Sequence, residues 1–164
     1  MPDPGRPPVA HWMIVTSVDN YEATRRLRFT IQGVKSRHRR KADRMRPGDR
    51  VCWYLTGRAA FAATATIASE RFEGTDPIWV SERTGDPYPW RFRISADHSL
   101  APESAVAAAS LLDGLRFVRR WPRRHWRLAF QGNVHELGAD DFALVEGAVA
   151  AAERAEARAA GGAR

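Results

Sequence analysis

Cysteine, long apolar runs and the signatures of secretion are what this sequence has least of. Cys52 is the only cysteine among the 164 residues, which excludes an intramolecular disulfide and a cysteine-cluster zinc site. Its position in an apolar run predicts a buried structural thiol. No apolar run approaches the roughly 20 residues that a membrane-spanning helix needs, and the start of the chain lacks the basic and apolar segments of a signal peptide. We therefore expect a cytoplasmic protein with no membrane partner.

The patterns that mark catalytic, metal and phosphate-binding sites are also missing. The five histidines show no paired spacing with cysteine or with carboxylates, so we expect no metal site. The chain has no phosphate-cradling glycine loop and no G-x-S-x-G sequence. Carboxylates are few among the apolar strands, which argues against a glycosidase-like acid–base pair. The sequence thus predicts a protein that is not an enzyme and needs no cofactor.

Positive charge is what the chain has in excess. Lysine and arginine number 26 against 19 acidic residues, for a formal net charge of +7. Such a balance favours polyanionic partners. Arginine far outnumbers lysine and alanine is abundant, a bias that a GC-rich coding sequence also produces, so the distribution of charge must decide. A basic run from Lys35 to Arg46, opposed only by Asp43, permits a short helix and fits either a phosphate-contacting ridge or a solvated face.

The chain is organised around segment 44–57. Pro47, Gly48 and Asp49 form a turn sequence, and the uncharged residues 51–55 that follow predict a strand buried on both faces. The alternating residues 61–67 predict a hairpin with that strand across residues 56–59. Further strands are predicted at 12–15 and 90–94, a short one is possible at 128–131, and 29–34 is irregular or briefly extended.

Three helical segments are expected. Asp19 as N-cap with Glu22 three residues later predicts a helix after the first strand, so residues 17–20 form a strand-to-helix corner. Such corners leave backbone N–H groups and small polar side chains available to a ligand. Pro102 opens a second helix that Gly114 ends. A third begins at 140–141, with one apolar face formed by Phe142, Val145, Ala148, Val149 and Ala152.

These elements predict one α+β domain. Strands come mainly first, with helices interspersed at the ends, so a small, closed or nearly closed β-barrel of mixed or antiparallel strands with flanking helices fits better than a doubly wound sheet. We expect a flexible arm at 1–10, the domain at 11–152 and a fraying helical tail at 153–164. We expect the protein to act as a monomer.

Aromatic residues lie next to the basic runs, and a second basic and aromatic segment runs from Arg116 to Arg127. Most large aromatic side chains belong to a core. Trp79 is the exception that we select, because it lies between two loops, where a flat ring could stack on a base.

Several motifs, in order, resemble the EVE domain family. They are WMIVTS at 12–17 with Asn20, RPGDRV at 46–51 leading into WYLTG at 53–57, Phe61, PIW at 77–79, YPWRF at 88–92, WR at 126–127, FQG at 130–132, and Leu137 with DF at 141–142. This family belongs to the PUA-like superfamily and is related to the YTH readers of methylated adenine in RNA. The resemblance implies a PUA-like β-barrel with a pocket that accepts a modified base flipped out of its strand.

The resemblance also implies roles for individual residues. Ser17 and Asn20 would supply hydrogen bonds to the edge of the base, Gln32 a further edge contact, and Trp79 an aromatic wall. Where relatives often place a second aromatic wall, this chain has Phe29 or Ile31. The phosphate-binding candidates are Arg37, Arg39, Arg40, Lys41 and Arg44.

The function predicted from the sequence is therefore non-catalytic binding of RNA or DNA with recognition of a modified base. Two alternatives stay open: a small enzyme acting on a nucleotide or modified base in the same pocket, and an RNA-binding module without base selectivity. The choice between DNA and RNA, and the kind of modification, also stay open.

Overall fold

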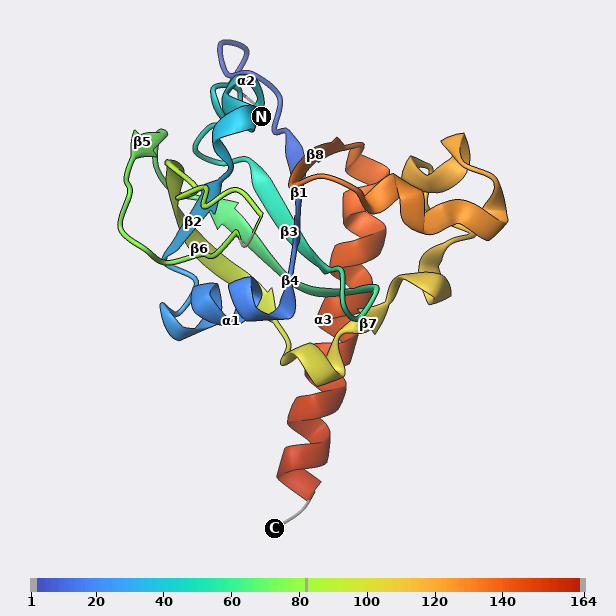
Figure 1. Ribbon diagram of the computed structural model, residues 1–164. Coiled ribbons are helices and arrows are strands. Elements are labelled where there is room, and N and C mark those ends of the chain that lie inside the picture. Colours follow the sequence, from blue (N-terminus) through green and yellow to red (C-terminus); the bar gives the residue numbers. More distant parts are fainter. Residues whose placement is uncertain (1–2, 82, 163–164) are drawn as a thin grey trace.

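One mixed sheet of eight strands forms the body of the computed structural model, which describes residues 3–81 and 83–162 (Figure 1). The central path of the sheet runs β2-β6-β4-β3-β1-β8, with β5 paired to β6 and β7 to β4. The strands are β1 His11–Thr16, β2 Ile31–Val34, β3 Arg50–Leu55, β4 Ala60–Ile67, β5 Phe72–Glu73, β6 Trp90–Ser99, β7 Val106–Ala107 and β8 Val134–Leu137.

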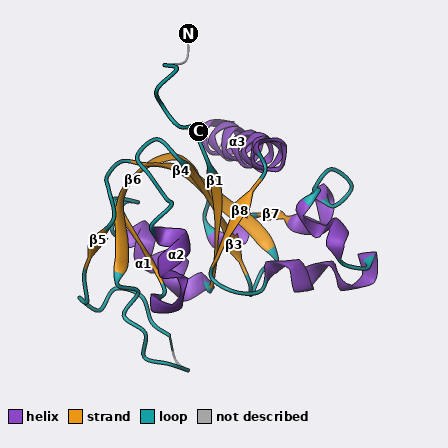
Figure 2. Cartoon of the chain, turned by 90° about the horizontal axis from the view of Figure 1, so that it is seen from above, coloured by secondary structure: helices purple, strands orange, loops and turns teal. Residues whose placement is uncertain are grey.

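Three α-helices and five 3-10 helices surround the sheet. They are α1 Val18–Arg26, α2 Arg39–Ala42 and α3 Ala139–Gly162, with η1 Ser36–His38, η2 Pro102–Ser104, η3 Ala108–Leu111, η4 Phe117–Arg120 and η5 Arg123–Phe130. Helix α3 packs along one side of the sheet and its C-terminal half extends beyond the domain (Figures 1 and 2). No helix of the described residues is long and apolar enough to cross a membrane.

The predicted hairpin is confirmed and forms the middle of the sheet. Strand β3 pairs antiparallel with β4 on one side and parallel with β1 on the other. Residues 51–55 are buried, and Cys52 is fully buried as predicted. The turn before β3 is held by the Asp49 carboxylate, which accepts hydrogen bonds from Ala10 N at 3.0 Å and from Trp12 Nε1 at 3.0 Å. Asp49 therefore ties the start of β1 to the start of β3.

The sheet curls into a half-barrel whose two end strands are connected by hydrogen bonds from residues next to them and from α2. The path ends at β2 and β8, and no ladder joins these two strands in the described part of the chain. Instead, Asn133 Oδ1 accepts a hydrogen bond from Lys35 N at 3.1 Å, and Lys41 Nζ donates to Val134 O at 2.8 Å. An α+β architecture of a curled mixed sheet with flanking helices is what the structure shows.

The first helix has a different cap from the predicted one. Ser17 is the N-cap of α1, and its Oγ accepts a hydrogen bond from Asn20 N at 3.1 Å. Asp19, predicted as the cap, lies in the first turn, where its negative charge favours the helix dipole. Glu22 forms an ion pair with Arg25 at 2.9 Å. The strand-to-helix corner at 17–20 is therefore present, but the helix is capped two residues earlier than predicted.

Three predictions about secondary structure were wrong or incomplete. Residues 102–114 contain η2, β7 and η3 instead of one helix, because β7 pairs with the end of β4 and stops a helix from continuing. Residues 128–131 are mostly in η5, and β8 follows after them. Segment 29–34 contains a regular strand, β2, which pairs antiparallel with β6.

The third predicted helix is confirmed as α3. Phe142, Val145 and Val149 are buried against the sheet, as the apolar face predicts. The helix continues through the predicted tail to Gly162, with exposed side chains after Glu153. Residues 1–2 of the predicted arm and 163–164 of the predicted tail lie outside the described residues.

Candidate nucleic-acid interface

A cleft of about 500 Å³ opens where β1 ends and α1 begins. One side is formed by residues 15–17, 19 and 20, and another by Lys35 and Arg37 just after β2. The third side is formed by Val80, Ser81, Arg83, Thr84 and Tyr88. An adjoining hollow of about 450 Å³ shares Lys35, Arg37 and Thr84 with the cleft, and Ser36 and the Asp86 carboxylate complete its lining. The cleft volume lies within the range of about 300–1,000 Å³ that is typical of small-ligand sites.

The predicted edge residues Ser17 and Asn20 both line this cleft, but Asn20 is committed to the protein. Its Nδ2 donates to Val80 O at 2.8 Å and to the Tyr88 hydroxyl at 3.2 Å, while its Oδ1 accepts from Val80 N at 2.8 Å. The side chain thus pairs with the backbone of the loop on both of its polar ends. Asn20 holds the rim of the cleft in place, and this occupies the groups that were predicted to meet a base.

Trp79 lies behind the cleft and does not line it. The ring is buried, and its Nε1 donates to Thr24 Oγ1 at 2.9 Å. It packs against Tyr88 with ring centroids 6.0 Å apart and against the backbone of Gly33. The prediction that Trp79 forms an open aromatic wall does not match this position, because the loop folds back and carries the indole under Tyr88.

Gln32 and Phe29 also lie away from the cleft. Gln32 is buried, its Oε1 accepting hydrogen bonds from Thr24 Oγ1 at 2.9 Å and from Trp53 Nε1 at 3.0 Å. Gln32 therefore links a side chain of α1, Thr24, to a side chain of β3, Trp53, inside the domain. Phe29 packs edge-on against Trp53 with ring centroids 5.6 Å apart. Both residues stabilise the core under the cleft and present no group to it.

Tyr88 is the aromatic side chain among the described lining residues of the cleft, and it was not among the site residues predicted from the sequence. Its backbone has a φ of 53°, a conformation that costs energy for a residue with a side chain. Asp86 Oδ1 accepts a hydrogen bond from Tyr88 N at 2.9 Å and stabilises this turn. Burial raises the pKa of the Tyr88 hydroxyl, so the group stays protonated and able to donate. The signal in the sequence was a tyrosine between two prolines.

A buried arginine anchors the same loop from below. Arg91, in β6, is 2% exposed and donates to the carbonyl oxygens of Asp76, Pro87 and Tyr88. Burial lowers the pKa of its guanidinium, and no carboxylate of the described residues forms an ion pair with it. The loop is therefore held by Arg91 beneath and by Asn20 at the rim.

The rim of the cleft is basic. Lys35 Nζ lies 5.7 Å from the centroid of the Tyr88 ring, a distance at which a cation and an aromatic ring attract each other. Arg37 and Arg83 line the cleft as well, and Asp19 is the one carboxylate among the described lining residues. The cleft thus combines a cationic rim with the small polar side chains of the corner at 16–20.

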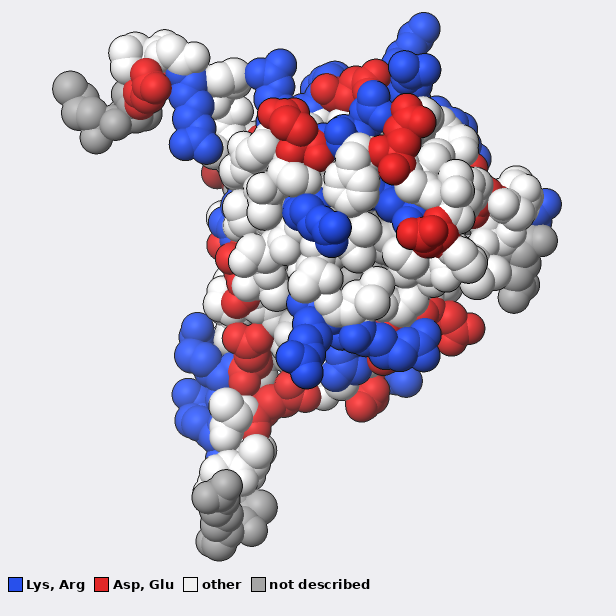
Figure 3. All heavy atoms as spheres, turned by 90° about the vertical axis from the view of Figure 1, so that its left-hand side faces the viewer, with Lys and Arg blue, Asp and Glu red and all other residues white. Residues whose placement is uncertain are grey.

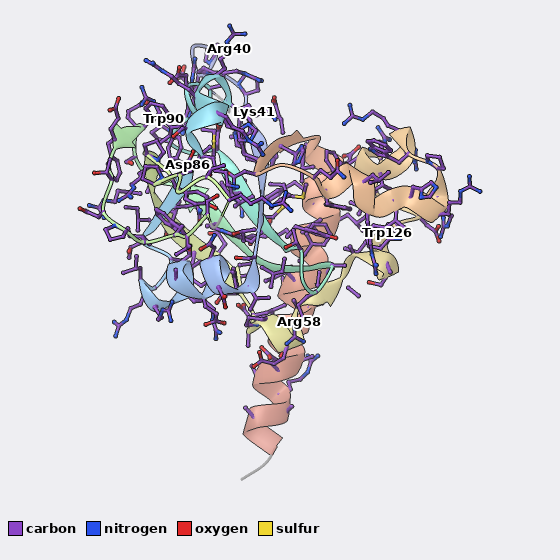
Figure 4. All side chains as sticks on the ribbon, in the orientation of Figure 1. Arg40, Lys41, Arg58, Asp86, Trp90 and Trp126 are labelled. Atoms are coloured by element: carbon purple, nitrogen blue, oxygen red, sulfur yellow. The ribbon has the colours of Figure 1, made fainter. Side chains whose placement is uncertain are left out.

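The predicted phosphate-binding residues differ in whether their side chains already contact other parts of the domain, as those of Lys41, Arg44 and Arg39 do. Arg37 lines the cleft, and Arg40 points away from the body of the domain at the outer edge of α2 (Figure 4). Lys41 donates to Val134 O, and its pKa is lowered by burial and by neighbouring arginines. Arg44 forms an ion pair with Glu136, and Arg39 stacks 5.4 Å from the ring of Trp90.

Acidic side chains temper the positive charge near α2. Asp43 pairs with Arg39 at 3.8 Å and with Arg71 at 2.9 Å. Figure 3 shows this mixture of signs at the upper end of the face over β5 and α1, and a denser group of Lys and Arg lower on that face. Within the predicted ridge, Arg37 and Arg40 are therefore the residues whose charges are open to a ligand.

Comparisons with known proteins place the fold. No protein-family model matches the chain. Two curated UPF0310 proteins, from Pyrococcus horikoshii and Pyrococcus abyssi, are each 22% identical to it, over 149 and 147 residues, and the matches cover 84% of this chain and 97% and 98% of theirs.

Solved structures of YTH domains share its architecture. The YTH domain protein Mmi1, solved in complex with RNA, matches with a TM-score of 0.59 at 10% identity over 85% of this chain and 81% of that chain. The fold is similar to that of YTH domains. A YTH domain from Zygosaccharomyces rouxii, solved with N6-methyladenosine RNA, matches with a TM-score of 0.57 at 13% identity over 92% and 93% of the two chains. A protein from Rhodopseudomonas palustris matches with a TM-score of 0.53 at 19% identity.

Proposed function

We propose that this protein is a non-catalytic nucleic-acid-binding domain of the EVE type, whose cleft receives a modified base flipped out of its strand. The observation that carries the proposal is that the first cations of the basic run, Lys35 and Arg37, line the cleft. Lys35 and Arg37 line both the cleft and the adjoining hollow, so a base in the cleft has cations beside it where its own phosphates would lie. The likeness to YTH domains, two of which were solved with RNA, supports the same class of ligand.

The lining of the cleft suits a base with an added apolar group. Ser17 Oγ accepts from Asn20 N and so retains its own O–H for donation to the edge of a base. The Tyr88 hydroxyl accepts from Asn20 and retains its O–H in the same way. Val80 is 68% exposed at the rim, where its side chain can contact a methyl group. Two donors and one apolar contact are enough to check both edge and rim of a base.

The cleft favours binding over catalysis. A general acid or base must lie within hydrogen-bond reach of the reacting proton, and a nucleophile needs a base beside it. Asp19 is the only carboxylate of the described lining residues, and no histidine or cysteine lines the cleft there. The first turn of α1 accounts for Asp19, because a negative charge at that position stabilises the helix.

The proposal is tested by binding to matched oligonucleotides with and without a modified base. RNA and DNA strands carrying N6-methyladenine or 5-methylcytosine are compared with plain strands by fluorescence anisotropy. We expect one modified strand to bind about tenfold more tightly, which corresponds to about 1.4 kcal/mol. Val80→Ala should reduce this preference, because it removes the apolar contact while the backbone bonds to Asn20 remain.

A matched control separates a local effect from a general one. Val9→Ala makes the same substitution at an exposed position that does not line the cleft, and it should keep the full preference. Equal binding of plain and modified strands by the wild type refutes base reading and leaves an unselective binding module. Arg37→Ala with Arg40→Ala should weaken all strands alike and reduce the salt dependence by about 0.7–0.9 for each lost phosphate contact.

A further inference from the structure

The second basic and aromatic segment forms a lobe on the opposite side of α3 from α1. We call residues 116–130, which contain η4 and η5, the arginine-tryptophan lobe. In Figure 1 it projects from the body of the domain beside α3. Its last residue, Phe130, stacks on Tyr54 of β3 with ring centroids 4.0 Å apart. The lobe is therefore anchored on the core of the domain and presents a fixed outer surface.

The surface of this lobe is strongly basic. Its six arginines are all exposed, and no acidic residue lies between 116 and 130. Acidic residues outside it meet two of them: Asp113 pairs with Arg123 at 2.6 Å and Asp140 with Arg116 at 3.8 Å. Both pairs are highly exposed, and such pairs contribute little stability. The lobe thus carries a concentrated positive charge that folding does not require.

A hollow of about 280 Å³ lies in this basic surface. Trp121 and Trp126 line it together with Arg119, Arg123 and Asp113, the carboxylate that pairs with Arg123. Trp126 packs edge-on against Phe130 and points back toward the domain (Figure 4). Trp121 is 38% exposed, although a large aromatic side chain gains stability from burial. Indole rings and guanidinium groups around one hollow are the combination on which unpaired bases stack while cations meet the phosphates.

The lobe is followed in the sequence by one residue of the cleft lining. Gln131 follows it in the sequence, and Gly132, the next residue, lines the cleft.

We propose that the arginine-tryptophan lobe is a second binding surface, which takes one base of a single strand in the hollow beside Trp121 and its phosphates on Arg119 and Arg123. A single strand is favoured over a duplex, because only unpaired bases expose faces to an indole ring. The proposal concerns unmodified strands, so it stands whether or not the cleft selects a modified base.

Two variants of the full chain test the two parts of this surface. The probe is plain oligouridine or oligothymidine of about 16 nucleotides, the upper end of the site size of a small single-strand binding domain. Trp121→Ala should weaken binding about tenfold, a loss in affinity that falls within the range for one stacked base. It should leave the salt dependence unchanged, because it removes no charge. Arg119→Ala with Arg123→Ala should also weaken binding and should lower the slope of log affinity against log salt by about 1.4 for two phosphates.

The control variant removes the same charge elsewhere. Arg154→Ala with Arg158→Ala changes two exposed arginines on the projecting part of α3 and should leave the affinity near that of the wild type. The probe carries no modified base, so its result is separate from the selectivity of the cleft.

Three results overturn the proposal. One is unchanged binding by both lobe variants, and another is an equal loss in the Arg154 and Arg158 control, which reduces the effect to net charge. The third is binding of vesicles made of phosphatidylglycerol and phosphatidylcholine, or of polyglutamate, without binding of oligonucleotides. That result assigns the lobe to a membrane surface or to an acidic protein segment instead.

Discussion

The side-chain amide of Asn20 is the contact whose removal tests how the cleft is held open. Three hydrogen bonds, of 2.8, 2.8 and 3.2 Å, join it to Val80 and Tyr88. Each such bond contributes about 0.5–1.5 kcal/mol net. The Val80 backbone lies at an exposed rim, where water can replace part of what is lost, so Asn20→Ala should cost about 2 kcal/mol of local stability.

Hydrogen exchange at the amide of Val80 measures this directly. A loss of about 2 kcal/mol should speed its exchange roughly 30-fold, because local opening then limits protection. Asn20→Asp keeps an oxygen for Val80 N–H but removes the donor to Val80 O. Because Asn20 is buried, water does not relieve the repulsion between the new carboxylate and Val80 O, so exchange at Val80 should be faster than in the wild type here too.

A nearby substitution serves as control. Ser81→Ala removes the 2.9 Å hydrogen bond between Ser81 Oγ and Thr84 Oγ1 in the same loop, and it should leave exchange at Val80 unchanged. Exchange at Val80 in Asn20→Ala that is no faster than in wild type refutes the reasoning. It would mean that Arg91 alone holds the loop through Asp76, Pro87 and Tyr88.

Three further outcomes are expected. Gly33→Ala should lower the free energy of unfolding, measured in urea, by about 1–3 kcal/mol, because the new Cβ would lie 2.6 Å from the Trp79 ring. Gly57→Ala, with space around the new Cβ, should not lower it. Equal urea midpoints for the two variants would contradict this packing. His38 has its pKa lowered to about 4, by burial first and by nearby cations such as Arg37 and Lys41 second. The unfolded chain binds this proton near pH 6.5, so stability should fall as pH drops from 6.5 to about 4, and His38→Gln should remove that part of the slope; an unchanged slope would contradict it. Cys52 should resist thiol reagents at neutral pH until the protein unfolds, since burial raises the pKa of its thiol; fast reaction of the native protein would contradict this.

Local patterns predicted the elements whose signals are themselves local. The hairpin of β3 and β4 has uncharged and alternating residues on either side of a short turn, and α3 has a long apolar face. Residues 102–114 have a helical spacing too, but β7 pairs with β4 across more than forty residues of sequence, and that contact prevails. Strand β8 was missed because it is short and precedes a strong helix signal.

The candidate site was predicted where it depends on the corner after β1. Ser17 and Asn20 line the cleft because a strand followed at once by a capped helix must place them there. Trp79 and Tyr88 belong to an irregular loop whose path depends on Asn20 and Arg91, residues that approach it from other elements. Which of the two rings meets the cleft is therefore not readable from their neighbours in the sequence.

The sequence by itself determined the α+β class, the central hairpin, the buried Cys52 and the basic segments, because hydrophobic pattern, turn chemistry and charge are properties of consecutive residues. The tertiary structure alone decided which cations are open to a ligand, since Lys41, Arg44 and Arg39 find partners on β8 and β6 that lie far away along the chain. It also decided that Trp79 is buried, that Tyr88 lines the cleft, and that Trp121 and Trp126 share one hollow. Each of these depends on contacts between distant segments, which only the folded chain brings together.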